Sequence, residues 1–336
     1  MDREAAVLKA VALLSGGLDS TLAVKLILDQ GIEVEALNYV TPFCNCNRRG
    51  GCEATRVADT FDIPHKTYAF TEEFFRVIRQ PKHGYGRGMN PCLDCRILMF
   101  SRARERMEET GAAFVFTGEV LGQRPMSQHR QAMRIIERES GLEGRLLRPL
   151  SARLMEPTIP ELEGTVDREK LEAIQGRSRK PQMAMADEHG LADYPCPAGG
   201  CMLTDPGFAR RMRDLVAFGP EFDLGDVNLL KTGRHFRLTP AAKAVVGRNE
   251  GENRLLGSLA RPGDLLFEVK QCGSPVGLLR GQADTREICL TAAITARYSD
   301  AQDADVEVHY GTDYAALDRT LLVEPLEEEE LTGLRL

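Results

Sequence analysis

Hydrophobic positions in the first 150 residues form short runs that alternate with amphipathic stretches. The runs predict β-strands, and the stretches between them have apolar residues at helical spacing. Glycine follows two of these stretches directly, at Gly31 and Gly111, as is common after the last residue of a helix. Strands that alternate with helices predict an α/β domain with a doubly wound parallel sheet. The predicted strands are 5–14, 33–40, 65–70, 113–118 and 145–150, and the predicted helices are 20–30, 53–61 and 95–110.

The pattern changes beyond residue 150. Residues 151–166 contain two prolines and one glycine, which is typical of a connector, and a short helical stretch follows. From about residue 222 the chain shows short strands with turns, a helix near 285–298 and a strand at 304–310, which predict a C-terminal α+β domain. We therefore expect a first domain at 1–165, a helical connector with a cysteine-containing loop at 166–221, and the α+β domain at 222–336.

Composition narrows the classes of protein. The chain has 336 residues with a net charge of −7, which argues against a protein that coats nucleic acid along its whole surface. Four basic stretches, at 145–153, 176–181, 208–213 and 231–238, suit a partner that is met on one face. The sequence shows neither a signal peptide nor an apolar stretch long enough to span a bilayer, so we expect a cytoplasmic protein with no membrane partner.

Cysteine is concentrated in three short segments. Seven of the nine cysteines lie in these groups, and in a reducing cytosol such clustering indicates metal or sulfur chemistry more often than disulfides. The other two, Cys272 and Cys289, are interpreted as ordinary core residues. The groups are Cys44, Cys46 and Cys52; Cys92 and Cys95; and Cys196 and Cys201.

The segment SGGLDS, residues 15–20, ends the first predicted strand and opens the first predicted helix. Free backbone N–H groups at a helix N-terminus, with the helix dipole behind them, form a site for phosphate. The lysine and the spacing of a Walker A loop are both missing, which disfavours transfer of a γ-phosphate. The stretch LLSGGLDST resembles the pyrophosphate loop of the PP-loop ATPases, which cleave ATP between the α and β phosphates to adenylate a substrate.

That resemblance implies a nucleotide site. Ser15, Gly16, Gly17, Asp19 and Ser20 are then expected to hold the pyrophosphate, with Asp19 also a partner of Mg²⁺. A bridging Mg²⁺ would remove the repulsion between the carboxylate and the phosphates.

A second motif selects among PP-loop enzymes. The stretch FTGEVLGQRPMSQ, residues 116–128, resembles a segment of the thiouridine synthetases that act on transfer RNA (tRNA). It follows a predicted strand, so it is expected at the carboxyl edge of the sheet, facing the nucleotide. The residues carried over are Gly118, Glu119 and Gln123.

The pair Cys92 and Cys95 begins a predicted helix, whose N-terminus is expected to favour thiolates. Two cysteines are not a metal site, because zinc and a 4Fe–4S cluster each take four ligands, although a cluster leaves one iron open for substrate with three. Cys201 is the preferred third ligand because two glycines precede it, and Cys196 is the alternative. The resemblance to cluster-dependent tRNA thiolases supports a site of three cysteines; a nucleophilic cysteine with a persulfide-bearing cysteine is the other interpretation.

The remaining group, Cys44, Cys46 and Cys52, follows the second predicted strand and is expected at the same edge of the sheet. It suits either a structural zinc site that lacks an identified fourth ligand or a sulfur relay.

Residues 229–256 resemble the RNA-binding domain of the NFACT proteins through a lysine-led strand and a VGRN…EN turn. Lys231, Arg234 and Arg248 are the expected RNA-binding residues, and phosphate contacts of this kind position RNA without reading its sequence. His235, Arg237, Lys243, Asn249 and Asn253 are expected to add charge and polar reach.

Together these features predict a tRNA sulfurtransferase that adenylates a uridine carbonyl oxygen and replaces that oxygen with sulfur. Its expected cofactors are ATP, Mg²⁺ and an iron–sulfur cluster or zinc, and its partners are tRNA and a sulfur donor, either a protein or sulfide. Two alternatives are a PP-loop enzyme that acts on a small molecule, as in deazaguanine nitrile synthesis, and a non-catalytic RNA-binding factor. The clustered cysteines and the intact SGGLDS disfavour the second, and an appended RNA-binding domain disfavours the first.

Overall fold

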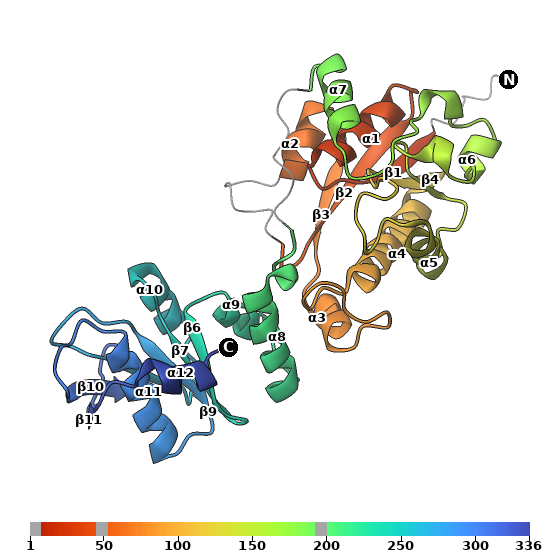
Figure 1. Cartoon of the computed structure of the whole chain (residues 1–336). Coiled ribbons are helices and arrows are strands. Elements are labelled where there is room, and N and C mark those ends of the chain that lie inside the picture. Colours follow the sequence, from red (N-terminus) through yellow and green to blue (C-terminus); the bar gives the residue numbers. More distant parts are fainter. Residues whose placement is uncertain (1–7, 45–52, 192–199) are drawn as a thin grey trace. The chain divides into compact units, whose positions relative to one another are not determined.

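The computed structural model describes residues 8–44, 53–191 and 200–336. The chain divides into two compact units, Met1–Met202 and Leu203–Leu336 (Figure 1). The boundary falls inside the predicted connector 166–221, so part of the connector belongs to each unit. The domain bounds expected from the sequence stay a prediction.

The first unit contains a five-stranded sheet in the order β3-β2-β1-β4-β5, with every neighbouring pair parallel. The doubly wound α/β domain predicted from the sequence is therefore confirmed. All the predicted strands and helices of this unit are present, and α3, α5 and α6 are additional. The elements are β1 (Lys9–Leu13), α1 (Leu18–Leu28), β2 (Glu33–Val40), α2 (Glu53–Thr60), β3 (His65–Ala69), α3 (Glu72–Arg79), α4 (Cys92–Thr110), β4 (Phe114–Thr117), α5 (Arg130–Ser140), β5 (Leu146–Leu147), α6 (Ile159–Leu162) and α7 (Lys180–Glu188).

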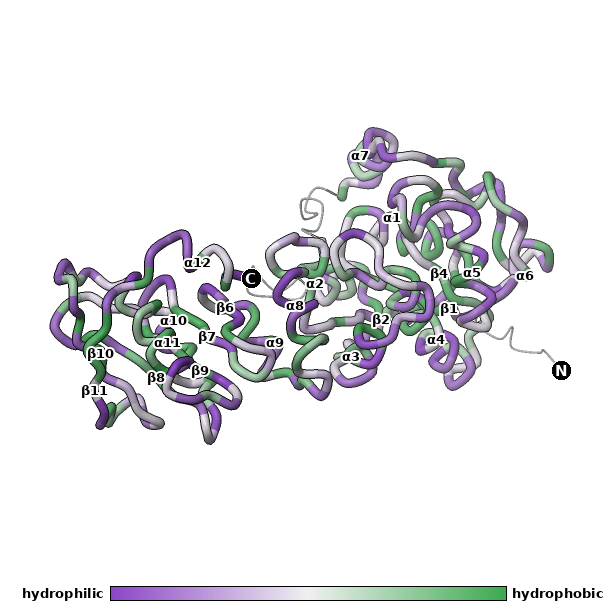
Figure 2. Tube along the Cα trace, turned by 60° about the horizontal axis from the view of Figure 1, so that its bottom comes forward, coloured by the Kyte–Doolittle hydropathy of each residue, from purple (hydrophilic) through white to green (hydrophobic). Residues whose placement is uncertain are grey.

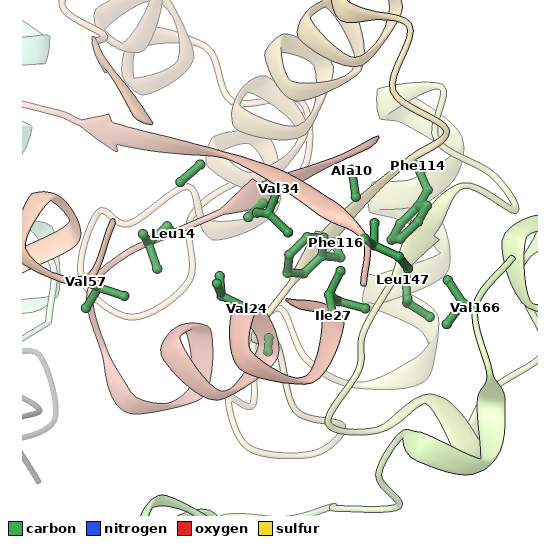
Figure 3. Close-up of a cluster of buried hydrophobic side chains, with 14 of the residues drawn as sticks. Ala10, Leu14, Val24, Ile27, Val34, Val57, Phe114, Phe116, Leu147 and Val166 are labelled. Atoms are coloured by element: carbon green, nitrogen blue, oxygen red, sulfur yellow. The ribbon is translucent and has the colours of Figure 1, made fainter. Parts of the chain in front are cut away.

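Helices cover both faces of this sheet. Helices α1, α2 and α7 lie on one face, and α4 and α5 lie on the other (Figure 1). Helix α1 is buried on two sides because Val24 and Ile27 pack against the sheet while Leu22 packs toward α7. In Figure 3, Val24 and Ile27 point toward Phe116 of β4. This packing fixes the N-terminus of α1 against the end of β4.

The strand order by itself indicates where a ligand would bind. From β1 the chain moves outward through β2 to β3, and it then returns to β4 on the other side of β1. Ligands of such sheets bind where the order reverses, beyond the carboxyl ends of the strands. The segment after β1 begins at Leu14, and the segment after β4 begins at Gly118, so both sequence motifs flank this point.

The second unit is an α+β fold built on a six-stranded antiparallel sheet, as predicted. The strand order is β11-β10-β8-β9-β7-β6. Strands β7 and β8 are hydrophobic along most of their length (Figure 2). Successive residues of β8 serve different clusters: Leu266 packs with Leu256 of α10, and Phe267 packs with Ala292 of α11. The elements are α8 (Pro206–Phe218), α9 (Leu224–Leu230), β6 (Arg234–Thr239), β7 (Ala242–Val246), α10 (Glu250–Leu259), β8 (Leu265–Glu268), β9 (Gly277–Gly281), α11 (Thr285–Arg297), β10 (Val306–Gly311), β11 (Arg319–Val323) and α12 (Glu328–Leu334).

No helix in the described part of the chain is long and apolar enough to cross a membrane.

Candidate active site

The segment Ser15–Gly17 forms a tight turn between β1 and α1. Gly16 has a φ of +75°, and a Cβ there would lie 2.4 Å from the carbonyl carbon of Glu53, so only glycine fits. Gly17 is the N-cap of α1 and has no side chain to satisfy the first amides of the helix. The Oγ atoms of Ser15 and Ser20 lie 3.1 Å apart, and the Ser20 hydroxyl donates to the Gly17 carbonyl at 2.8 Å. These contacts hold the turn together, and the N-terminus of α1, which has no side-chain cap, suits a phosphate group.

The segment after β4 packs directly on this turn. A Cβ at Gly118 would lie 2.4 Å from both the carbonyl carbon of Asp19 and the amide nitrogen of Ser20. Five residues further on, Nε2 of Gln123 donates to Oδ2 of Asp19 at 3.1 Å. The two sequence motifs therefore form one site, and Gly118 and Gln123 act on it by positioning Asp19.

Asp19 is held by side chains from two segments. Its Oδ2 accepts from Gln123 and lies 3.5 Å from Nη2 of Arg179. Its Oδ1 is buried, and within the described residues it has no hydrogen-bond partner. A buried carboxylate oxygen that is left open in this way suits a hard cation such as Mg²⁺.

Glu119 connects the nucleotide side of the site to the cysteine side. Its carboxylate is almost fully buried, and Oε2 accepts from Nε of Arg148 at 3.2 Å. Its Oε1 lies 3.5 Å from Nε of Arg96, the residue that follows Cys95 in α4. Glu119 thus bonds to Arg148 and pairs with Arg96, which ties α4 to the end of β4, while Oε1 has no hydrogen-bond partner among the described residues. Its expected contact with the nucleotide stays a prediction.

Cys92 and Cys95 lie in the first turn of α4, as the sequence predicted. Burial raises the pKa of Cys92, although the charges of Arg96 and Arg124 oppose this. Burial also raises the pKa of Cys95, to about 12, with the nearby thiols of Cys201, Cys92 and Cys44 raising it further and Arg96 lowering it. The expectation that the helix N-terminus favours thiolates is wrong for the ligand-free site, because desolvation raises the pKa of both thiols.

Cys201 lies beside Cys44. The two residues face each other in an antiparallel β-bridge, and the Met202 amide donates to the Phe43 carbonyl at 3.0 Å. The Cys44 sulfur also lies 3.2 Å from the Thr41 hydroxyl oxygen. Cys44 therefore gathers with Cys92, Cys95 and Cys201, whereas its expected partners Cys46 and Cys52, and the alternative ligand Cys196, lie outside the described residues.

A metal centre is not preformed among these thiols. In the part of the chain that the structure describes, no group of three or more His, Cys, Asp or Glu side chains is arranged to hold a metal ion. The donor set is still of the type that a soft metal prefers, because the four thiols are close enough to interact electrostatically and lie near Arg96 and Arg124, whose charges would offset those of thiolates. The three-cysteine site therefore stays a prediction.

Three arginines near the site were not predicted as site residues from the sequence. Arg96 follows the CxxC pair, Arg124 lies between the two halves of the LGQ…SQ motif, and Arg179 lies in the basic stretch 176–181. The pKa of Arg124 is lowered by desolvation and by the charge of Arg96, while Cys92 and Asp19 raise it, although its side chain reaches solvent. The available signal was charge alone, and charge without a motif more often marks a solvated surface.

In the second unit, the expected RNA-binding residues already have protein partners. Lys231 donates to the Asn228 carboxamide at 3.0 Å, and burial lowers its pKa. Arg234 donates to the Gly247 carbonyl at 2.9 Å and lies over the Tyr298 ring.

Arg248 is partly exposed and pairs with Glu252, which also accepts from the Gly233 amide at 3.2 Å. This pairing compensates much of the Arg248 charge. The three residues stay predicted RNA contacts.

Five further residues of this unit serve the fold. His235 is buried, and its pKa is lowered well below the usual range by desolvation, so it does not supply the charge that we expected from it. Arg237 and Lys243 both pair with buried Asp214, at 2.5 Å and 3.3 Å. The side chains of Asn249 and Asn253 accept from the backbone amides of Glu252 and Val276, respectively.

Two solved structures resemble the chain weakly. A 4-thiouridine synthetase in complex with RNA and bound ATP has a TM-score of 0.37 and 20% identity, covering 66% of this chain and 52% of that chain. The U34-tRNA thiolase NcsA from Methanococcus maripaludis, with its 4Fe–4S cluster, has a TM-score of 0.34 and 16% identity, covering 67% of this chain and 70% of that chain. Both scores are too low to carry an argument about function.

Curated relatives are tRNA-specific 2-thiouridylases. MnmA 1 of Caldanaerobacter subterraneus subsp. tengcongensis is 30% identical over 125 residues, which are 33% of this chain and 34% of that protein. MnmA of Xanthobacter autotrophicus is 28% identical over 230 residues, which are 64% of this chain and 56% of that protein. The chain thus spans from a third to about half of the length of these relatives.

Two family models match separate parts of the chain. The model described as thiamine biosynthesis protein (ThiI) matches residues 6–156, and the model described as NFACT protein RNA binding domain matches residues 233–334. Both resemblances inferred from the motifs are thereby confirmed. Residues 6–156, which contain the five-stranded parallel sheet, thus resemble a ThiI-family domain, and residues 233–334 resemble the NFACT RNA-binding domain.

Proposed function

We propose that the protein is an AMP-forming tRNA sulfurtransferase that adenylates a uridine carbonyl oxygen and then exchanges that oxygen for sulfur. One observation carries the proposal: the phosphate turn and the thiols lie at one edge of the sheet and are physically linked. Gly118 packs on Asp19, and the next residue, Glu119, pairs with Arg96 beside Cys95. An activating site and a sulfur-bearing site are thus joined across adjacent residues of a single loop.

The nucleotide half of the reaction falls to the turn and its supports. Ser15, Gly16, Gly17 and Ser20 would hold the pyrophosphate part of ATP through the first amides of α1. Asp19, with one buried oxygen open, would hold Mg²⁺, which neutralises charge on the phosphates. ATP would be cleaved to AMP and pyrophosphate, in keeping with the missing Walker lysine.

The sulfur half falls to Cys92, Cys95 and Cys201, with Cys196 as the alternative third cysteine. Thiolates at these positions would hold a 4Fe–4S cluster, which supplies an open iron site for sulfur; zinc or a persulfide are the other occupants to test. The convergence of Cys201 with Cys95 supports this assignment. The arginines at positions 96 and 124 would offset the added negative charge.

The RNA substrate is supported by the second unit and by the relatives. The NFACT-type match covers residues 233–334, and the curated relatives are named for tRNA 2-thiolation. A separate protein or free sulfide would donate the sulfur, and the reaction would take place in the cytoplasm, where tRNA is found.

Mass spectrometry of tRNA nucleosides tests this proposal. A strain that lacks the gene is complemented with wild type, Asp19→Asn, Cys95→Ser or the control Asp29→Asn, a partly exposed aspartate at the other end of α1. We expect one thiolated nucleoside to disappear in the deletion strain, to return with wild type and Asp29→Asn, and to stay below about a tenth of normal with the other two variants. An unchanged nucleoside profile in the deletion strain would contradict the proposal.

A further inference from the structure

Arg179 places a cation beside the turn at residues 15–17, although it lies outside the two motifs at 15–20 and 116–128. It belongs to the basic stretch GRSRKP, residues 176–181, which lies beyond the segment matched by the ThiI model. Its Nη2 atom lies 3.5 Å from Oδ2 of Asp19. From the sequence, this stretch was expected only to add positive charge toward a partner, so its contact with Asp19 requires an explanation.

Two sets of contacts hold the Arg179 segment in place. The Gly176 amide donates to the Leu121 carbonyl at 2.7 Å, and Gln175 pairs with Leu121 as a parallel β-bridge. On the other side, α7 packs on α1, with Ala186 in the same buried cluster as Leu22. The guanidinium is thus delivered by a segment that is fastened both to the LGQ motif and to the phosphate helix.

The local hydrogen bonding is incomplete. Nε of Arg179 and Oδ1 of Asp19 are both buried, and neither has a hydrogen-bond partner within the described residues. Buried polar atoms are nearly always bonded, so an open donor and an open acceptor on two side chains that form one ion pair indicate a ligand with both an anionic and a cationic part. A magnesium polyphosphate has both. Arg124, whose charge interacts with Asp19, adds positive potential to the same region.

We propose that Arg179 is a binding residue for the β and γ phosphates of ATP, and for the pyrophosphate that ATP leaves. The guanidinium donates to phosphate oxygens, and Asp19 holds the Mg²⁺ that accompanies them. This assignment rests on the nucleotide half of the proposed function. It predicts that the loss of Arg179 weakens polyphosphate binding and spares the adenosine end.

Calorimetric binding to the full-length protein tests the assignment with three ligands: Mg-ATP, Mg-pyrophosphate and AMP. Arg179→Gln should weaken ATP and pyrophosphate binding by about tenfold or more, and change AMP binding by less than about twofold. Arg179→Lys, which keeps the charge, should recover part of the loss. The matched control is Arg177→Gln, an exposed arginine of the same stretch, which should bind like wild type.

Equal affinities for Arg179→Gln and Arg177→Gln would overturn the assignment, and so would an equal loss for AMP. Thermal unfolding of each variant excludes a folding defect, and Arg179→Lys keeps the test valid if the glutamine variant is unstable. Failure of the proposed function gives a different result, because wild type would then bind nucleotide normally while no thiolated nucleoside depends on the gene.

Discussion

Cys95 lies in the first turn of α4 near three other thiols, and its chemistry decides what the site carries. Burial and the neighbouring thiols raise its pKa to about 12, so without a ligand it stays protonated at neutral pH. A metal that displaces the proton would remove this penalty, since thiolate–metal bonding supplies the charge compensation that the protein interior lacks.

We predict that protein purified without oxygen contains iron and acid-labile sulfide. The substitutions Cys92→Ser, Cys95→Ser and Cys201→Ser should each reduce the iron content at least about tenfold, because a cluster with two protein ligands is poorly held. Cys289→Ser is the control, and Cys44→Ser should also retain iron. Zinc in place of iron would favour a zinc site, and the absence of both metals would favour a persulfide. Full loss of iron in Cys196→Ser would make Cys196 the third ligand.

At this scale, the residues inside motifs were predictable and their partners were not. The SGGLDS segment predicted a tight turn between a strand and a helix, and the structure contains this turn between β1 and α1. Its role in binding phosphate stays a prediction. The segment did not show that Gly118 touches the backbone of Asp19, or that Arg179 reaches the same carboxylate. Those contacts join positions far apart in the chain, and only the packing of the sheet and α7 brings them together.

At the scale of elements, periodicity found the strands and helices that have one simple buried face. Helix α3 was missed although Phe74, Phe75 and Ile78 are buried at helical spacing, because its eight residues follow closely on β3. Helices α9 and α10 were also missed, since their short sequences combine glycine with turn-forming Asp and Asn. The sheet order of the second unit was not predictable, because non-local antiparallel pairing leaves no local signature.

The packing of β7 against α8 buries a lysine whose titration can be measured. Lys243 of β7 is buried against Asp214 of α8, and desolvation lowers its pKa from 10.5 to about 8. Between these values the unfolded state binds more protons than the folded state, so the free energy of unfolding should rise with pH across this window. Below pH 8 both states are protonated and this contribution is constant.

We predict that Lys243→Met abolishes that rise. Wild type should gain up to about 3 kcal/mol relative to the variant from pH 8 to pH 10.5, at 1.36 kcal/mol per pKa unit. Urea unfolding read by pulsed hydrogen exchange of peptides from β6 and β7 reports on this unit alone. Lys270→Met, at an exposed position, is the control. Parallel pH profiles for wild type and Lys243→Met would show that Lys243 is fully charged in the folded state.

At the scale of the whole molecule, the features behind the proposed function are distributed over two units. The first carries the phosphate turn and the described thiols of the site, and the second carries an independent sheet with its own hydrophobic clusters. The net charge of −7 shows that the protein is not basic overall. RNA affinity should therefore depend on local cations, several of which are already partly compensated, as Arg248 is by Glu252.

We predict that a chain ending at Met202 keeps ATP binding and loses most of its affinity for tRNA. In full-length protein, Lys231, Arg234 and Arg248 changed together to glutamine should flatten the slope of log K against log salt concentration by up to about 3, since each phosphate contact releases about one counterion. The measurement is a salt titration of tRNA binding. Preference among tRNA sequences should stay unchanged, because phosphate contacts position RNA without reading it.

The matched control changes Lys270, Arg286 and Arg319 to glutamine, three exposed cations on other parts of the same unit. This variant has the same net charge as the first, so a flatter slope in the first variant alone identifies a specific surface. An equal change in both would mean that total charge governs binding. If tRNA affinity is unchanged in both variants and in the chain ending at Met202, the RNA-binding site lies in the first unit. The basic segments 145–153 and 176–181 are then the remaining candidates.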